Sequence, residues 1–234
     1  MKVDLFGDSI GSVEYVDHMG SDLSVVNAAR VSFGVEKEEL DDKDAKLINY
    51  LMQHNHSSPF EHCVLTMRFT VPLFIRSQHH RHRTWAYNEI SRRYTSVDMK
   101  FYSPPAFRTQ HKSNRQASNN ELIDPTLNSS YIAIGFEDAS KAVAMHNTRS
   151  MGLYNALIDA GVCREQARGV LPQNLYTEYY GSVSLHNLFK FIGLRSHDGA
   201  QWEIQQVAKA CLDIALKHFP VATEAYMKKY ISEK

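Results

Sequence analysis

Alternation of apolar and polar residues marks one segment of the chain, from position 63 to position 71. Leucine, methionine, phenylalanine and valine occupy every second position from 65 onward, with threonine or arginine between them. A period of two is typical of a β-strand with one buried face. The pattern therefore predicts a strand that Pro72 ends. Two further segments, 14–16 and 175–182, also have the composition of strands.

Helical periodicity and capping residues predict most of the other elements. Ser21 can cap a helix through 22–29, and the carboxylates at 41–44 suit the start of a second helix, because the helix dipole favours negative charge there. Pro72 can open a short helix at 73–75. Further helices are expected at 128–161, capped by Asn128-Ser129, and at 164–171, 184–193 and 198–218. We expect an α+β fold, a mostly antiparallel twisted sheet flanked by helices.

The stretch from 101 to 128 has no hydrophobic period and is rich in proline, serine and asparagine. A segment of this kind is typical of a long surface loop, which often serves as a lid. It is also compatible with a linker between two domains. Because neither flanking half has the pattern of a self-sufficient unit, we expect residues 1–234 to form a single domain.

Composition excludes several classes of protein. The 234 residues carry 26 Lys+Arg and 26 Asp+Glu, and zero net charge argues against a surface that binds nucleic acid throughout. No apolar stretch approaches the roughly 20 residues of a membrane span, and the first residues lack the apolar core of a signal peptide. Three widely spaced cysteines, Cys63, Cys163 and Cys211, suit a reducing compartment. We therefore expect a soluble, cytoplasmic protein.

The segment 81–94 is the most informative part of the chain, with four arginines among tryptophan, tyrosine, asparagine, glutamate and serine. Arginine forks bind phosphate, and aromatic rings can stack on planar ligands. Asn88 and Glu89 can read the hydrogen-bonding edge of a heterocycle. The pattern favours a phosphorylated ligand with a base, either a free nucleotide or a nucleic acid. A solvated basic loop is the alternative. No glycine motif for dinucleotides or P-loop is present.

Six of the twelve histidines lie between His54 and His82. Such a group raises the possibility of a metalloenzyme. A zinc site needs three or four ligands and supporting carboxylates, and no carboxylate at ligand spacing accompanies these histidines, although Glu61 adjoins His62. We expect no metal site, and elemental analysis would detect one.

Arg81-His82-Arg83, followed after seven residues by Ser91, matches the RHR-x7-S signature of the flavin-dependent thymidylate synthases. Other blocks resemble that family in the same order along most of the chain. They are 28–32, 56–62, 88–89, 93–94, 167–168, 171–172, 193–195 and 200–204. An ordered series of this length is far more specific than the RHR triplet alone.

The resemblance implies the reductive methylation of dUMP to dTMP. Methylene-tetrahydrofolate would supply the carbon, and FAD reduced by NADPH would supply the hydride. The family resemblance also implies a homotetramer that holds FAD at its subunit interfaces, with small-molecule substrates and no nucleic-acid or membrane partner. A flavin held at an interface would explain why the dinucleotide motif is missing.

The resemblance also assigns site residues. The dUMP contacts would be Gln78, Arg81, Glu89, Ser91, Arg92, Arg93, Arg168 and Arg195. The FAD contacts would be Ser32, Ser58, Glu61, Arg81, His82, Arg83, Glu89, Ser184, His186 and Lys190, and folate would contact His56 and Tyr94. The chain departs from the usual family residues around Ser184, His186 and Lys190, so its flavin affinity is expected to differ. Gln78 and Arg81 would share a helix face if the helix at 73 extends that far.

The chemistry requires that C5 of uracil become electron-rich. A cysteine that adds at C6 must be a thiolate, but Cys63 and Cys211 fall at apolar core positions. The alternative is a fixed cation that stabilises negative charge on the pyrimidine ring. Arg195 matches the family arginine thought to favour the ionised N3 of dUMP, and we expect it to be catalytic. Its structural alternative is a helix-end arginine that binds the carbonyls after Gly193.

Overall fold

The computed structural model describes residues 1–115, 117–127 and 137–231. The chain divides into two compact units, and it passes between them four times. The first unit comprises Met1–Thr70, Gln78–Asn88 and Tyr179–Lys234, and the second comprises Val71–Ser77 and Glu89–Glu178. Neither unit is therefore a continuous piece of the chain.

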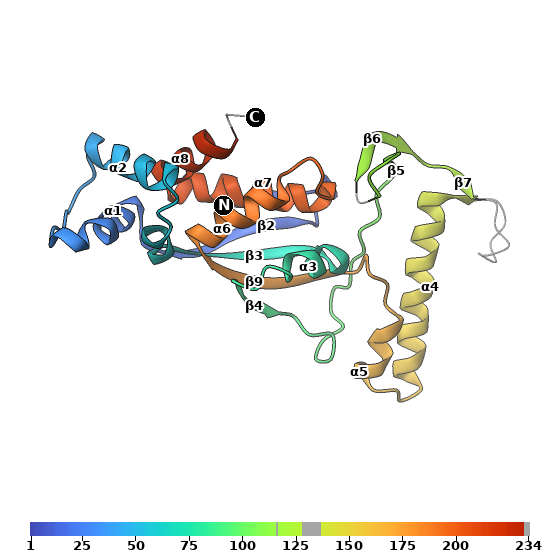
Figure 1. The fold of residues 1–234 in the computed structure, drawn as a ribbon. Helices are drawn as coiled ribbons and strands as arrows, with labels where there is room; N and C mark the ends of the chain where they lie inside the picture. The colour runs from blue at the N-terminus through green and yellow to red at the C-terminus, as the bar shows by residue number, and fades with distance from the viewer. Residues whose placement is uncertain (116, 128–136, 232–234) are drawn as a thin grey trace. The chain divides into compact units, whose positions relative to one another are not determined.

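A five-stranded sheet is the centre of the first unit (Figure 1). Its strand order is β1 (Lys2–Asp4), β2 (Ser12–Met19), β3 (Val64–Pro72), β9 (Tyr176–Ser184) and β4 (Ala86–Glu89). β2 pairs antiparallel with both β1 and β3, so that Val13 lies opposite Val3 on one side and Phe69 on the other. The expected α+β fold with an antiparallel sheet is confirmed.

The alternating pattern of β3 corresponds to one buried and one half-exposed face. Leu65, Met67 and Phe69 are fully buried. The residues between them are partly exposed and pair with neighbouring strands: Thr66 Oγ1 lies 2.8 Å from Ser182 Oγ, and Arg68 forms an ion pair with Glu14. Full burial of each large apolar side chain stabilises the folded state by about 1.5–3 kcal/mol. Apolar residues are therefore favoured at every second position of this strand, and the sequence shows the alternation clearly.

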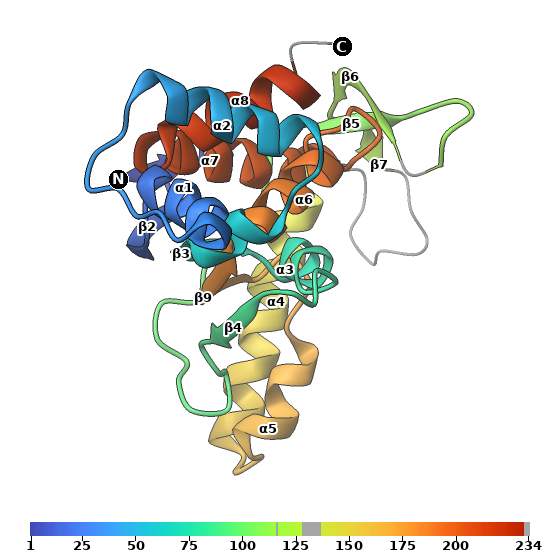
Figure 2. The same cartoon turned by 60° about the vertical axis from the view of Figure 1, so that its left-hand side comes forward.

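Helices pack on one face of this sheet in two layers (Figures 1 and 2). The inner layer contains α6 (Leu185–Arg195) and α7 (Trp202–His218). Outside them, α8 (Pro220–Tyr230) packs between α7 and α2 (Asp42–Gln53), and α1 (Asp22–Arg30) adjoins α2. Three 3₁₀ turns were not anticipated as separate elements: η1 (Val31–Phe33), η2 (Ser58–His62) and η3 (Arg168–Val170).

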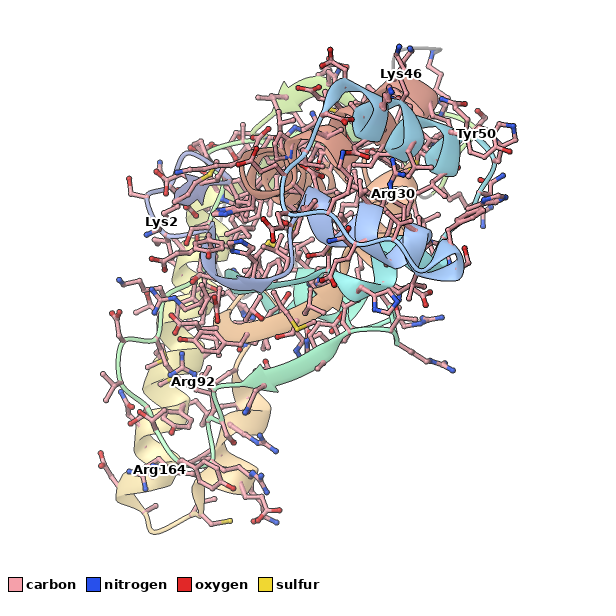
Figure 3. All side chains as sticks on the ribbon, turned by 90° about the vertical axis from the view of Figure 1, so that its left-hand side faces the viewer. Lys2, Arg30, Lys46, Tyr50, Arg92 and Arg164 are labelled. Atoms are coloured by element: carbon pink, nitrogen blue, oxygen red, sulfur yellow. The ribbon has the colours of Figure 1, made fainter. Side chains whose placement is uncertain are left out.

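An ion cluster fastens the chain between α1 and α2. The buried carboxylate of Asp44 accepts a hydrogen bond from Arg30 Nη2 at 2.7 Å and pairs with Lys37. Figure 3 shows Arg30 where α1 faces α2. Burial raises the pKa of Asp44, but the hydrogen bonds from Lys37, Arg30 and the Asp41 backbone outweigh it, so the pKa is lowered. Asp44 therefore stays ionised at neutral pH.

Helix α8 is absent from the sequence-based expectations. Pro220 lies two residues beyond the helix expected at 198–218, where a proline is typical of a helix end, but proline also suits the first turn of a helix, and here it occupies that position of α8. Asp22, a buried carboxylate at the start of α1, accepts from the backbone amides of Val221 and Ala222, both at 2.9 Å. Asp22 therefore caps the start of α8, although it lies far from α8 in the sequence.

The stretch 101–128 was expected to be a long surface loop, but the structure contains strands there. β5 (Phe107–Gln110) pairs antiparallel with β6 (Ser118–Ile123), and β7 (Thr126–Leu127) pairs with β8 (Glu137–Asp138). These strands bury no continuous face, so their polar sequences carry no alternation. Asn128 and Ser129, the expected caps, lie outside the described residues. Helix α4 runs over Ala139–Asp159 and ends as expected before a glycine of positive φ.

The remaining helices are short, or begin later than expected. α3 (Leu73–His79) and α5 (Arg164–Ala167) belong to the segments predicted at 73–75 and 164–171, while α7 begins four residues later than expected. In the second unit, Tyr154, Ala167, Leu171 and Leu175 form a small apolar core. Within the described residues, no helix is long and apolar enough to cross a membrane.

Candidate functional site

The second unit contains a cavity of about 680 Å³. Its polar lining consists of Arg76, Glu89, Ser91, Arg92, Arg93, Glu165, Arg168, Gln173 and Thr177. Four arginines against two glutamates give this lining a net charge of +2. A cavity with several guanidinium groups and an excess of positive charge suits a phosphate group. Five predicted dUMP contacts, Glu89, Ser91, Arg92, Arg93 and Arg168, are brought together here.

The turn after β4 presents three of these residues. The backbone amide of Tyr94 donates to Ser91 O at 2.9 Å, which closes the turn. Ser91 Oγ accepts from the backbone amide of Arg93 at 3.3 Å and from Arg93 Nε at 3.4 Å. The Arg93 guanidinium also lies 5.2 Å from the ring centroid of Tyr94. The hydroxyl of Ser91 therefore acts as a hydrogen-bond acceptor in this turn.

Arg92 is more enclosed than its neighbour. Its Nη1 donates to Val97 O at 2.9 Å, while its Nε is buried with no hydrogen-bond partner among the described residues. Burial lowers the pKa of Arg92, although Tyr154 and Asp98 act in the opposite direction. A guanidinium titrates so far above neutral pH that it remains a cation. An unpaired buried donor is unusual and fits an anion site.

Glu89 ends β4 and is held by two side chains that the sequence did not single out. Its Oε1 accepts from Arg76 Nε at 3.1 Å and from the hydroxyl of Thr177 at 2.7 Å. Arg76 lies on α3 and Thr177 on β9. Neither belongs to a short motif with Glu89, so only the fold could reveal the contact.

In the first unit, Arg195 lies at the end of α6 and donates away from its own helix. Its Nε donates to His82 Nε2 at 2.9 Å, and its Nη2 donates to Gln78 O at 3.4 Å. This arrangement differs from that of a helix-end arginine that binds the carbonyls of α6. Burial, with a smaller effect from Arg81, lowers the pKa of Arg195, which nevertheless remains a cation.

The contact with Arg195 determines the protonation of His82. Arginine has no acceptor, so Nε2 of His82 accepts, and its proton lies on Nδ1. Burial, followed by the positive charge of Arg195, lowers the pKa of His82 to about 4. The imidazole is therefore neutral at pH 7. It holds the guanidinium without neutralising its charge.

Gln78 and Arg81 do not share a helix face, because the helix does not extend as far as Arg81. Helix α3 ends at His79, because the chain turns there, with the Arg81 backbone amide donating to Gln78 O at 3.3 Å. The amide side chain of Gln78 instead donates to Gln201. The side chains of Arg81 and Arg83 are exposed.

The tryptophan of the basic segment belongs to the core. Trp85 is only 6% exposed, and its ring meets that of the buried His79 edge-on at 4.4 Å. His79 Nδ1 lies 2.8 Å from the Tyr179 hydroxyl, and burial holds the pKa of His79 well below its ordinary value. The aromatic rings of this segment were expected to be able to stack on a ligand, but the ring of Trp85 is buried among core side chains instead. The described residues contain no group of three or more potential metal ligands.

A second cavity, of about 590 Å³, lies within the first unit between α2, α6 and α8. Leu51, Met52, Phe60, Phe189 and Tyr226 supply apolar and aromatic walls. His56, His186 and Lys190 supply its polar groups. The cavity thus gathers two predicted FAD contacts and one predicted folate contact. Burial, followed by the charge of Lys190, lowers the pKa of His186, so this imidazole is neutral at pH 7.

The other predicted flavin contacts do not line this cavity. Ser32, Ser58 and Glu61 are exposed on the 3₁₀ turns η1 and η2. Ser184 is the N-cap of α6, and its hydroxyl accepts from the backbone amide and the side chain of Asn187 at 3.5 and 3.1 Å. Tyr94, the second predicted folate contact, is 77% exposed.

Two of the three cysteines are unsuited to nucleophilic chemistry. Cys63 is buried and donates to Ser21 O at 3.3 Å, and burial raises the pKa of its thiol to about 12. Burial also raises the pKa of the Cys211 thiol far above neutral. Both therefore occupy the core positions expected from the sequence. Cys163 is exposed at the start of α5.

The fold, the arginine-lined cavity and the second, aromatic cavity define an enzyme that handles a phosphorylated small molecule. A family model described as "Thymidylate synthase complementing protein" matches residues 14–221. The flavin-dependent thymidylate synthase of Thermus thermophilus is 45% identical over 92% of this chain and 75% of its own length. The enzyme of that name from Thermotoga neapolitana is 42% identical, with 93% and 91% covered.

A solved structure agrees with these relatives. The UMP/dUMP methylase PolB from Streptomyces cacaoi, bound with 5-Br dUMP, is 33% identical and superposes with a TM-score of 0.79 over 97% of each chain. The chain belongs to the flavin-dependent thymidylate synthase family.

Proposed function

We propose that this protein catalyses the reductive methylation of dUMP to dTMP. The observation that carries the proposal is the cavity of the second unit, whose lining has four arginines and a net charge of +2, in a chain of this family. Arg92, Arg93 and Arg168 would bind the phosphate, and Ser91 and Glu89 would hold the rest of the nucleotide. Gln78, Arg81 and Arg195 complete the proposed dUMP contacts.

Arg195 would act as the fixed cation of the reaction. Negative charge develops on the uracil when C5 becomes nucleophilic, and a guanidinium held in place stabilises that charge without first having to reorganise. The hydrogen bonds to His82 Nε2 and Gln78 O supply this rigidity. Because His82 is neutral at pH 7, it orients the arginine without cancelling its charge.

The residues around the second cavity fit a flavin cofactor. Its apolar and aromatic walls suit a planar ring system, Lys190 offers a cation, and the rings of His186 and His56 offer nitrogen atoms for polar parts of the cofactor. Arg81, His82, Arg83, Ser32, Ser58, Glu61, Glu89 and Ser184 would supply further contacts. FAD supplies the hydride when it is bound. The relatives named above are flavin-dependent, which supports this choice.

The remaining parts of the proposal follow the family resemblance. NADPH would reduce FAD, and methylene-tetrahydrofolate would deliver the carbon near His56 and Tyr94. Residues 1–234 would work as one domain within a cytoplasmic homotetramer, with FAD held at the subunit interfaces. Buried thiols without disulfide partners suit the reducing cytoplasm.

The proposal is tested by turnover with single omissions. Purified protein from which bound flavin has been removed is expected to form dTMP when FAD, NADPH, methylene-tetrahydrofolate and dUMP are added, and omission of any one component is expected to abolish the product. Elemental analysis and salt-dependent oligonucleotide binding test the metalloenzyme and nucleic-acid alternatives in the same preparation. A protein that binds no flavin and forms no dTMP would refute the proposal.

A further inference from the structure

The environment of Glu89 is asymmetric. Its Oε1 takes both protein donors, Arg76 Nε and the hydroxyl of Thr177, while Oε2 has no hydrogen-bond partner among the described residues. Thr177 is only 5% exposed, so its hydroxyl is fixed in the wall of the cavity. One carboxylate oxygen is thus anchored to the protein and the other is available to a ligand.

The anchoring of Glu89 matters because positively charged arginines line the same cavity. The same cavity is lined by Arg92, Arg93 and Arg168, three guanidiniums suited to a phosphate. A glutamate side chain that is free to rotate beside them would form an ion pair with one of them, because charge-assisted pairs of arginine and carboxylate are among the stronger polar contacts. Such a pair would withdraw an arginine from phosphate binding.

Arg76 gives the carboxylate a partner other than these three arginines. It is the fourth arginine of the lining and the one that already pairs with Glu89, at 3.1 Å. Both side chains are partly shielded, with 32% and 23% of their surface exposed, so solvent screens the pair only in part.

We propose that Arg76 is a positioning residue for nucleotide binding. Together with Thr177 it holds Glu89 against the cavity wall, which leaves Oε2 free to accept from the nucleotide and keeps Arg92, Arg93 and Arg168 free for its phosphate. The inference rests on the proposed function, because it takes this cavity as the dUMP site.

A double-mutant cycle on the full-length protein tests the inference. Binding of dUMP is measured by titration calorimetry for the wild type, Arg76→Met, Glu89→Gln and the combined variant. Arg76→Met is expected to raise the dissociation constant about tenfold or more, the scale of one lost charge-assisted contact. In the Glu89→Gln background it is expected to have little further effect, since a neutral amide does not pair with the arginines.

Two controls separate positioning from a general loss of structure. Arg76→Lys keeps the charge and is expected to recover part of the affinity. Arg149→Met removes an exposed arginine of α4 that does not line the cavity, and it is expected to bind dUMP as the wild type does. Flavin bound after purification, measured by absorbance, is expected to be the same in the wild type, Arg76→Met, Arg76→Lys and Arg149→Met, because neither Arg76 nor Arg149 lines the cavity proposed for flavin.

The outcomes are distinct. Wild-type affinity in Arg76→Met overturns the inference alone. If Arg76→Met weakens dUMP binding by the same factor in the wild type and in Glu89→Gln, the inference is also overturned, because Arg76 would then contact the nucleotide directly. A wild-type protein that does not bind dUMP refutes the proposed function, and this inference falls with it.

Discussion

At the scale of single residues, the proposed mechanism depends on how neighbouring groups orient the side chain of Arg195. Arg195 is an arginine at a helix end, but its donors reach His82 and Gln78, which fix the direction of its guanidinium. Sequence comparison could nominate Arg195 because it follows a family block. It could not show that a neutral histidine supports it, since that depends on burial in the folded chain.

Arg195→Lys tests the need for a planar, fixed cation. Lysine keeps the charge but loses the fork that donates to two acceptors at once. We expect kcat for dTMP formation to fall about tenfold to a hundredfold, with a smaller change in KM, because the lost interaction strengthens as ring charge develops. Steady-state kinetics with dUMP as the varied substrate give both numbers. An unchanged kcat would make Arg195 a purely structural residue.

His82 gives a prediction about pH. Its pKa is about 4 in the folded protein against an ordinary value of 6.5, so the unfolded chain takes up the proton first. The contribution of neutral His82 to the stability of the folded state is therefore fully present above pH 6.5. It is lost as the pH falls from 6.5 towards 4, because the unfolded chain is then protonated at this residue and the folded chain is not. His82→Gln keeps an acceptor for Arg195 but does not titrate. The free energy of unfolding, measured in urea from pH 7 to pH 4.5, should fall less steeply in this variant than in the wild type. Equal slopes would contradict the assignment.

At the scale of elements, helix α8 depends on a distant cap. Asp22 accepts from the backbone amides of Val221 and Ala222, and Lys229 near the other end donates to Met52 O at 2.7 Å, at the end of α2. These contacts fasten α8 beside α2, where Tyr226 and Tyr230 line the proposed flavin cavity. The local pattern of α8 contains no signal for them.

Asp22→Ala is expected to destabilise the first unit by about 0.5–2 kcal/mol, the range measured for a lost N-cap. Urea unfolding followed by circular dichroism measures the loss. The matched control is Asp42→Ala, which removes an exposed carboxylate from the first turn of α2 and should cost only a few tenths of a kcal/mol, the lower range for a charge near a helix start. Similar losses in both variants would show that the contact with α8 does not stabilise the fold.

Elements with a strong local pattern could be predicted, and elements that depend on contacts distant in sequence could not. Strand β3 could be predicted because one of its faces is buried along its length. Helices α1 and α2 could be predicted because Ser21 and Asp41 are their N-cap residues. Strand β4 was not predicted because its polar residues show no alternation. Helix α8 was not predicted because proline can either follow the end of a helix or occupy the first turn of one. Likewise, the arginines of the cavity formed a motif, whereas Arg76 and Thr177 meet Glu89 only in the folded chain.

At the scale of the whole molecule, the two cavities proposed as binding sites lie in different compact units. The second unit has the arginine-lined cavity proposed for dUMP, and the first has the aromatic cavity proposed for flavin. Burial makes the thiols of Cys63 and Cys211 unsuited to nucleophilic attack, which is consistent with the proposed electrostatic route in which Arg195 is the fixed cation.

A single-turnover experiment tests the central claim most directly. The protein is loaded with FAD, the flavin is reduced chemically without NADPH under anaerobic conditions, and dUMP and methylene-tetrahydrofolate are added together. We predict about one dTMP formed for each flavin reoxidised, as expected if the flavin carries the hydride. Reduced flavin that stays bound while no dTMP appears, or dTMP formed equally well by flavin-free protein, would contradict the account.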